Sequence, residues 1–244
     1  MKHQYVGDIN DYRKYALLRA LSAGGANRIG VCWMLTPSDG RSDGNLLGYL
    51  KKPERYRQHD PELFDILAHA ASEPGRRRLH TIEDSAAIPN AIYYNETLPD
   101  DEAKRMMFMR RCATAFADAD LVFFDPDNGL EVSIQKGRKN SSKYVYLDEL
   151  AAFYEAGKSL LIYQHFARIN RKTFIASCVD RLGQVAPDAA IWVFTTANVA
   201  FFLLVHPGSP ERLTNAATEA CSRWEPDFIN GQPIGGDAGA EPAG

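Results

Sequence analysis

The segment from Leu121 to Glu131, LVFFDPDNGLE, constrains the fold of this chain more than any other. Its four leading apolar residues are too few for a helix, and their side chains favour a buried strand. The Asp-Pro-Asp-Asn-Gly that follows ends the strand in a tight turn. Polar residues after a buried strand lie at the carboxyl edge of an open α/β sheet, where such sheets bind ligands. The alternative is a structural turn, but such a turn needs only one or two polar residues, and this segment has Asp125, Asp127, Asn128 and Glu131.

The composition is that of an ordinary globular protein. The 244 residues suffice for one α/β domain with a small insertion, and 45% of them are hydrophobic and 24% charged. The four cysteines have no close spacing, which favours a reducing compartment over a disulfide framework or a zinc site. The first residues lack the apolar run of a signal peptide, and the apolar segment at 197–205 is too short to span a bilayer. We therefore expect a cytoplasmic protein without a membrane partner.

Hydrophobic patterns predict alternating strands and helices. The expected strands are 28–35, 91–94, 121–124, 159–163, 190–195 and 199–205, and the main helices are 10–22, 61–71, one from about 99, 148–156, 171–182 and 210–223. Strands separated by helices indicate a mostly parallel sheet, whereas the last two strands are too close for a crossover and must pair antiparallel. This α/β arrangement is the Rossmann-like one associated with S-adenosylmethionine-dependent methyltransferases. We expect one domain over 1–230, with a helical insertion at about 45–75 and a disordered tail over 231–244.

Several motifs follow one another in the order found in a known family. His3 precedes the segment Gly7–Tyr15, GDINDYRKY, which leads into the first helix. A polar loop with glycines, Leu35–Gly44, follows the first strand, and Asp-Pro-Asp-Asn follows the strand at 121–124. His206-Pro207 then separates the final hairpin from the last helix. In this order of features the chain resembles, over most of its length, the large-subunit ribosomal RNA adenine-N6 methyltransferases of the RlmJ type.

The resemblance implies a Rossmann-like methyltransferase fold, S-adenosylmethionine as cofactor, and a nucleic acid or nucleotide-like substrate. In that family an Asp-Pro-Pro-Tyr motif accepts hydrogen bonds from the exocyclic amine of the base and stacks its aromatic ring on the extruded base. Asp125 and Pro126 match the first two positions, whereas Asp127 and Asn128 replace Pro and Tyr. We expect all four residues to form the catalytic site. Stacking would then come from another aromatic residue, with Tyr163, Phe166 and Tyr144 as candidates.

The resemblance also implies where the cofactor lies. The expected cofactor-binding residues are Asp8, Lys14, Tyr15, Asp39, Gly40, Glu83, Asn95 and Glu96. The loop containing Gly40 and Gly44 allows a ligand to approach the backbone closely, although it is also ordinary loop chemistry. If residues 78–82 form a strand, Glu83 or Asp84 follows it at the position of the family's ribose-binding carboxylate.

Basic residues and one histidine are expected near the same edge. Lys136, Arg138 and Lys139 lie in a loop after the strand at 121–124 and are predicted to bind phosphate groups. His165 follows the strand at 159–163 and is interpreted either as a general base or base contact, or as a partly buried structural histidine. We further expect Asp125→Ala to abolish activity while leaving the fold intact.

Two other classes of function remain open. One is a metal-dependent nuclease or phosphoesterase using Mg²⁺ or Mn²⁺, because many carboxylates would meet at one sheet edge: Asp8, Asp11, Asp39, Asp43, Asp125 and Asp127. Against it, no acidic-x-Lys nuclease motif has the right spacing, and no metal ligand is assigned. The other is a non-catalytic module that keeps the methyltransferase scaffold. The sequence does not set the oligomeric state.

Overall fold

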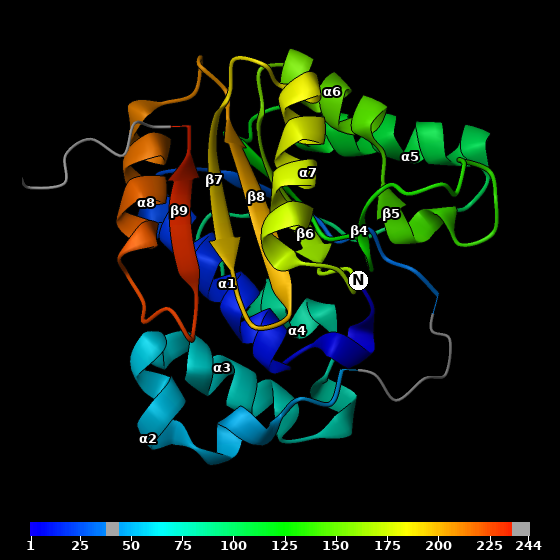
Figure 1. Cartoon of the computed structure of the whole chain (residues 1–244). Coiled ribbons are helices and arrows are strands. Elements are labelled where there is room, and N and C mark those ends of the chain that lie inside the picture. Colours follow the sequence, from blue (N-terminus) through cyan, green and yellow to red (C-terminus); the bar gives the residue numbers. More distant parts are fainter. Residues whose placement is uncertain (38–43, 236–244) are drawn as a thin grey trace, which may run out of the picture.

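The computed structural model describes residues 1–37 and 44–235 (Figure 1). Its centre is a seven-stranded sheet with the order β2-β1-β3-β6-β8-β7-β9. The strands are β1 (Ile29–Cys32), β2 (Ile92–Tyr94), β3 (Leu121–Phe124), β6 (Ser159–His165), β7 (Ala190–Thr195), β8 (Val199–Val205) and β9 (Asn230–Ile234). A separate parallel ladder joins β4 (Gly129–Leu130) to β5 (Tyr144–Val145).

The pairing confirms a mostly parallel α/β sheet with an antiparallel C-terminal hairpin. β2, β1, β3 and β6 are parallel neighbours. β8 lies between β6 and β7 and is antiparallel to both. Its pairing with β7 must be antiparallel because only residues 196–198 connect the two strands. The arrangement is consistent with the expected Rossmann-like fold.

Helices cover both faces of the sheet (Figure 1). They are α1 (Ile9–Ser22), α2 (Pro53–Tyr56), α3 (Pro61–Ala71), α4 (Leu79–Asp84), α5 (Glu102–Ala115), α6 (Leu147–Glu155), α7 (Arg171–Val185) and α8 (Glu211–Cys221). Alternation along β3 separates two cores, since Leu121 and Phe123 pack with α1, α3 and α8, whereas Val122 and Phe124 pack with α5, α6 and α7. No helix within residues 1–37 and 44–235 combines the length and the apolarity that a membrane span requires.

The expected bounds of the helical insertion and of the C-terminal tail differ from those in the structure. The helical segment between β1 and β2 extends beyond residue 75, because residues 79–84 form α4 and not the strand considered at 78–82. Residues 231–234 of the expected tail belong to β9, which adds to the free edge of β7. Gly231 allows this contact: a Cβ there would lie 2.6 Å from the ring of Phe194. Residues 236–244 of the expected tail lie outside the described residues.

Candidate functional site

The expected catalytic residues lie beyond the ends of β1 and β3, the two strands from which the chain extends the sheet in opposite directions. β1 and β3 are neighbours, and their last residues, Cys32 and Phe124, are in register. From β1 the chain continues outward to β2 on one side, and from β3 it continues to β6 on the other. Open α/β sheets bind ligands beyond the carboxyl ends of the strands at such a topological switch point. Asp125, Pro126 and Asp127 follow β3 at this position.

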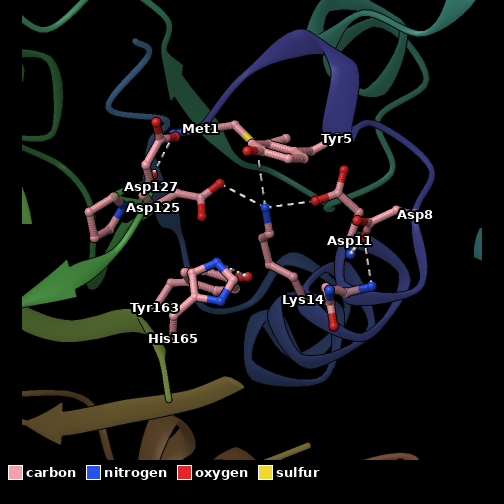
Figure 2. Close-up of a pocket in the computed structure, with 11 residues that line it drawn as sticks. Met1, Tyr5, Asp8, Asp11, Lys14, Asp125, Asp127, Tyr163 and His165 are labelled. Atoms are coloured by element: carbon pink, nitrogen blue, oxygen red, sulfur yellow. Dashed lines mark hydrogen bonds and ion pairs between the residues drawn. The ribbon is translucent and has the colours of Figure 1, made fainter. Parts of the chain in front are cut away.

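The beginning of α1 faces Asp125. Asp8 is the N-cap of the helix, and its Oδ1 accepts the backbone N–H groups of Asn10 at 2.7 Å and Asp11 at 3.0 Å. The cap fixes where the helix starts, and the spacing of three residues places Asp11 and Lys14 on one helical face. Figure 2 shows Lys14 of α1 pointing toward Asp125.

Lys14 forms a buried ion triad with two carboxylates. Its Nζ lies 2.8 Å from Oδ1 of Asp11 and 2.7 Å from Oδ2 of Asp125, and each of the three side chains is 3% exposed. Aromatic rings surround the ammonium, with centroids 5.4 to 5.8 Å from Nζ: Tyr15, Trp33 and Tyr163. The triad therefore connects α1 to the end of β3 through charge-assisted hydrogen bonds.

The triad has two acidic groups and one basic group, and their burial and mutual interactions shift the pKa values of Lys14 and Asp11. Burial alone would lower the pKa of Lys14, but the attraction and hydrogen bonds of Asp11 and Asp125 raise it above its usual value. Burial raises the pKa of Asp11 to about 7, and the neighbouring Asp8 and Asp125 carboxylates add to this rise against the opposing effect of Lys14. Asp11 therefore exchanges a proton near neutral pH, beside Asp125.

We expect the stability of the protein to fall between pH 5 and pH 8 because of Asp11. Its pKa is about 7 in the folded chain and close to the ordinary 3.8 when unfolded, so the folded state binds the extra proton in this range. Raising the pH removes that proton from a buried group. Urea unfolding of the wild type and Asp11→Asn at both pH values measures the effect, and the part due to Asp11 should be missing in the variant. An identical pH dependence in the two proteins would contradict the assignment.

The burial of Asp125 bears on the expectation that Asp125→Ala leaves the fold intact. Lys14 would still pair with Asp11, but the loss of the buried hydrogen bond between Asp125 and Lys14 is expected to lower the free energy of unfolding. Asp125→Asn is the better probe, because its amide oxygen retains an acceptor for Lys14 while the negative charge is lost.

Asp127 is also held by internal contacts. Its Oδ1 lies 2.8 Å from the amino group of Met1, and its Oδ2 accepts the hydroxyl of Thr36 at 2.7 Å. Burial would raise the pKa of Asp127, but the Met1 ammonium, the Thr36 hydroxyl and Lys2 together lower it below its usual range. Asp127 is therefore an ionised carboxylate that joins the turn after β3 to the segment after β1.

Hydrogen bonds join Asn128 and Leu130, on either side of Gly129 in the turn, to β6. The carbonyl of Asn128 accepts the backbone N–H of His165 at 3.1 Å and the Gln164 amide at 3.2 Å. Oε1 of Gln164 in turn accepts the N–H of Leu130 at 2.7 Å. Gly129 has φ +127°, and a Cβ there would lie 2.2 Å from Oε1 of Gln164, so only glycine fits. Asn128 shapes the turn through its backbone and does not line the pocket described next.

A pocket opens beside the triad at the carboxyl edge of the sheet. Its lining residues are Met1, Tyr5, Asp8, Asn10, Asp11, Lys14, Asp125, Pro126, Asp127, Tyr163 and His165. Its volume is about 30 Å³, which is room for one or two water molecules. Figure 2 shows Tyr163 and His165 together on one side, and the Tyr163 hydroxyl lies 3.3 Å from Nε2 of His165.

A second polar cluster lies at the carboxyl ends of β1 and β2. The Glu83 carboxylate accepts the indole N–H of Trp33 at 2.8 Å and the Asn95 amide at 3.1 Å. Glu83 is on α4, Trp33 follows β1 and Asn95 follows β2, so three separate segments converge here. Glu96, by contrast, pairs with Arg111 at 2.6 Å on the exposed side of α5.

The structure groups the remaining predicted residues differently from the sequence analysis. His165 is exposed at the pocket, as expected, whereas Tyr15 lies behind it and donates to Oδ2 of Asp11 at 3.1 Å. Lys136 pairs with Asp148 and does not line the pocket, and neither do the exposed Arg138 and Lys139. Asp39 and Gly40 lie outside the described residues.

Several residues of the site escaped the sequence analysis. Met1 and Tyr5 line the pocket, although nothing in the N-terminal residues distinguishes them. Trp33 was assigned to a strand at 28–35, but β1 ends at Cys32. A shorter strand, like that predicted for β3, would have placed Trp33 at the carboxyl edge.

The carboxylates of the site face a lysine in place of a metal ion. The Lys14 ammonium lies between Asp11 and Asp125, where a cation bridging these two side chains would have to be. Within the described part of the chain, no three His, Cys, Asp or Glu side chains are arranged to hold a metal. Among the described residues, Asp11 and Asp125 are therefore paired with Lys14 and are not arranged as metal ligands, while Asp39 and Asp43 lie outside the described residues.

No protein-family model, curated protein or solved structure matches this chain. The function is therefore argued from the geometry of the site.

Proposed function

We propose that the protein is an S-adenosylmethionine-dependent methyltransferase acting on a nucleic acid or nucleotide-like substrate. The observation that carries the proposal is the position of Asp125-Pro126 at the switch point between β1 and β3, in a mostly parallel sheet that ends in an antiparallel hairpin. This is the position at which the resembling family has the Asp-Pro that binds the acceptor amine.

The hydrogen-bonding groups at the carboxyl edge of the sheet fit a nucleoside cofactor. Glu83 is only partly buried and keeps lone pairs beyond those used by Trp33 and Asn95, so it would accept the hydroxyls of a ribose. The pocket at Asp125, at about 30 Å³, is far smaller than the roughly 300 Å³ or more of ligand pockets. It suits a small group such as an amine, and most of the cofactor would lie outside it. When bound, the cofactor supplies an electrophilic methyl group.

The residues around Asp125 would prepare the acceptor. Lys14 uses Oδ2 of Asp125, so Oδ1 would accept a hydrogen bond from the substrate amine. The hydrogen bond from Lys14 would hold the Asp125 side chain in place for this contact. Asp11, whose pKa is about 7, would exchange a proton through the same triad. Tyr163 and His165 line the pocket and would contact the base.

Calorimetric titration with S-adenosylmethionine and S-adenosylhomocysteine tests the proposal. We expect micromolar binding to the wild type and binding at least about tenfold weaker to Glu83→Gln, about 1.4 kcal/mol, because a charged acceptor is lost. Glu73→Gln is the matched control, since Glu73 is exposed, pairs with Arg76 and lies outside the expected cofactor site. Asp125→Asn should keep cofactor binding but lose methyl transfer to RNA or DNA. Absence of binding to the folded wild type would refute the proposal.

A further inference from the structure

A groove separates α5 from α6 on the face of the sheet that these helices share with α7. Its volume is about 700 Å³ and its lining is largely apolar. Met106, Met109 and Ala113 line it from α5, and Ala152, Phe153 and Ala156 from α6. Met106 is 51% exposed, which is unusual for a large apolar side chain beside an apolar groove. Methionine is flexible and packs well against partner surfaces.

Two opposite charges flank Met106 symmetrically. Glu102 precedes it by four residues and Arg110 follows it by four, so all three lie on one face of α5, about one turn apart. Both charged side chains are exposed and line the groove. Among residues 1–37 and 44–235, neither side chain forms a hydrogen bond or an ion pair, whereas the nearby Asp148 is neutralised by Lys136.

The charges of Glu102 and Arg110 on α5 are complementary to those on the α5 helix of a second copy of the chain. If a two-fold axis passes near Met106, the α5 helices of two copies run antiparallel across each other. Glu102 of each copy then faces Arg110 of the other, and Met106 of each copy covers the groove of the other. We propose that α5 and the groove beside α6 form the interface of a homodimer of this chain.

Sedimentation equilibrium of the full chain over a wide concentration range tests the proposal. We expect a dimer for the wild type and a monomer for Met106→Asp. The matched control is Met107→Asp, because Met107 is 47% exposed on the same helix but does not line the groove. Its dimer should be unchanged. Circular dichroism confirms that each variant is folded.

Charge exchange tests the antiparallel geometry itself. Glu102→Lys and Arg110→Glu should each weaken the homodimer by more than about tenfold, because like charges then face each other twice across the axis. Mixing the two variants should restore a heterodimer with both pairs attractive, and the double variant should restore the homodimer. A wild type that is monomeric at every concentration, or a dimer that survives Met106→Asp, would overturn the proposal. Single variants that fail to recover on mixing would overturn the antiparallel register.

Discussion

Replacing Lys14 with methionine is expected to lower the free energy of unfolding by about 3–5 kcal/mol at pH 7. Methionine keeps much of the volume among the surrounding rings but removes the ammonium that lies within hydrogen-bond distance of both Asp11 and Asp125. The two carboxylates then face each other in a buried site without a counterion. Urea unfolding followed by circular dichroism measures the change.

The matched control for this prediction is Lys139→Met. Lys139 is exposed in the loop before β5, and its replacement should change stability by less than about 0.5 kcal/mol. The effect of Lys14→Met should also be smaller at pH 5 than at pH 8, because Lys14 lowers the pKa of Asp11 and this carboxyl binds its proton more readily once the ammonium is gone. A Lys14→Met protein with the wild-type urea midpoint at pH 7 would show that the triad contributes nothing to stability.

The elements that the sequence predicted well are those with a strong local pattern. The four apolar residues of β3 followed by Asp-Pro-Asp-Asn-Gly gave the strand and its end, and the short spacing of β7 and β8 required their antiparallel pairing. The sequence analysis did not predict α4 and β9, for two different reasons. Residues 79–84 are too few for a clear helical period, and β9 contains glycine and proline, which normally indicate a loop.

The sequence predicted several residues of the site but not the contacts between their side chains. The strand ends placed Asp125 and His165 at one edge, and the resemblance placed Asp8 and Lys14 near them; all four line the pocket. It did not predict that Lys14 pairs with Asp125, because the two residues are 111 positions apart and meet only through the packing of α1 on the sheet. The Glu83–Asn95 contact likewise depends on α4, which the sequence did not predict.

Arg105 was missed altogether, since a charged residue within a polar helix usually faces solvent. It is 1% exposed, and its Nε and Nη2 donate to the Glu149 carboxylate at 2.5 and 2.9 Å. The same guanidinium donates to the carbonyls of Ser141 at 3.1 Å and Tyr144 at 2.7 Å. Arg105 thus connects α5, α6 and the end of the basic loop that carries Arg138 and Lys139.

Arg105→Met is therefore expected to destabilise the protein by about 3–5 kcal/mol, as for Lys14, because it leaves the Glu149 carboxylate buried without its partner. The exposed Arg110→Met on the same helix is the control and should change the unfolding free energy of the monomer by less than about 0.5 kcal/mol. Chemical denaturation at low protein concentration measures both variants.

The double variant Arg105→Met/Glu149→Leu distinguishes the cost of an unpaired charge from the loss of packing. It removes both charges, so it should be more stable than Arg105→Met alone. Recovery should be incomplete, because the Ser141 and Tyr144 carbonyls lose their donor and the Tyr146 N–H loses its acceptor on Glu149. A double variant less stable than Arg105→Met would mean that Glu149 stabilises the fold mainly through the Tyr146 N–H and Lys136, with its pairing to Arg105 a minor contribution.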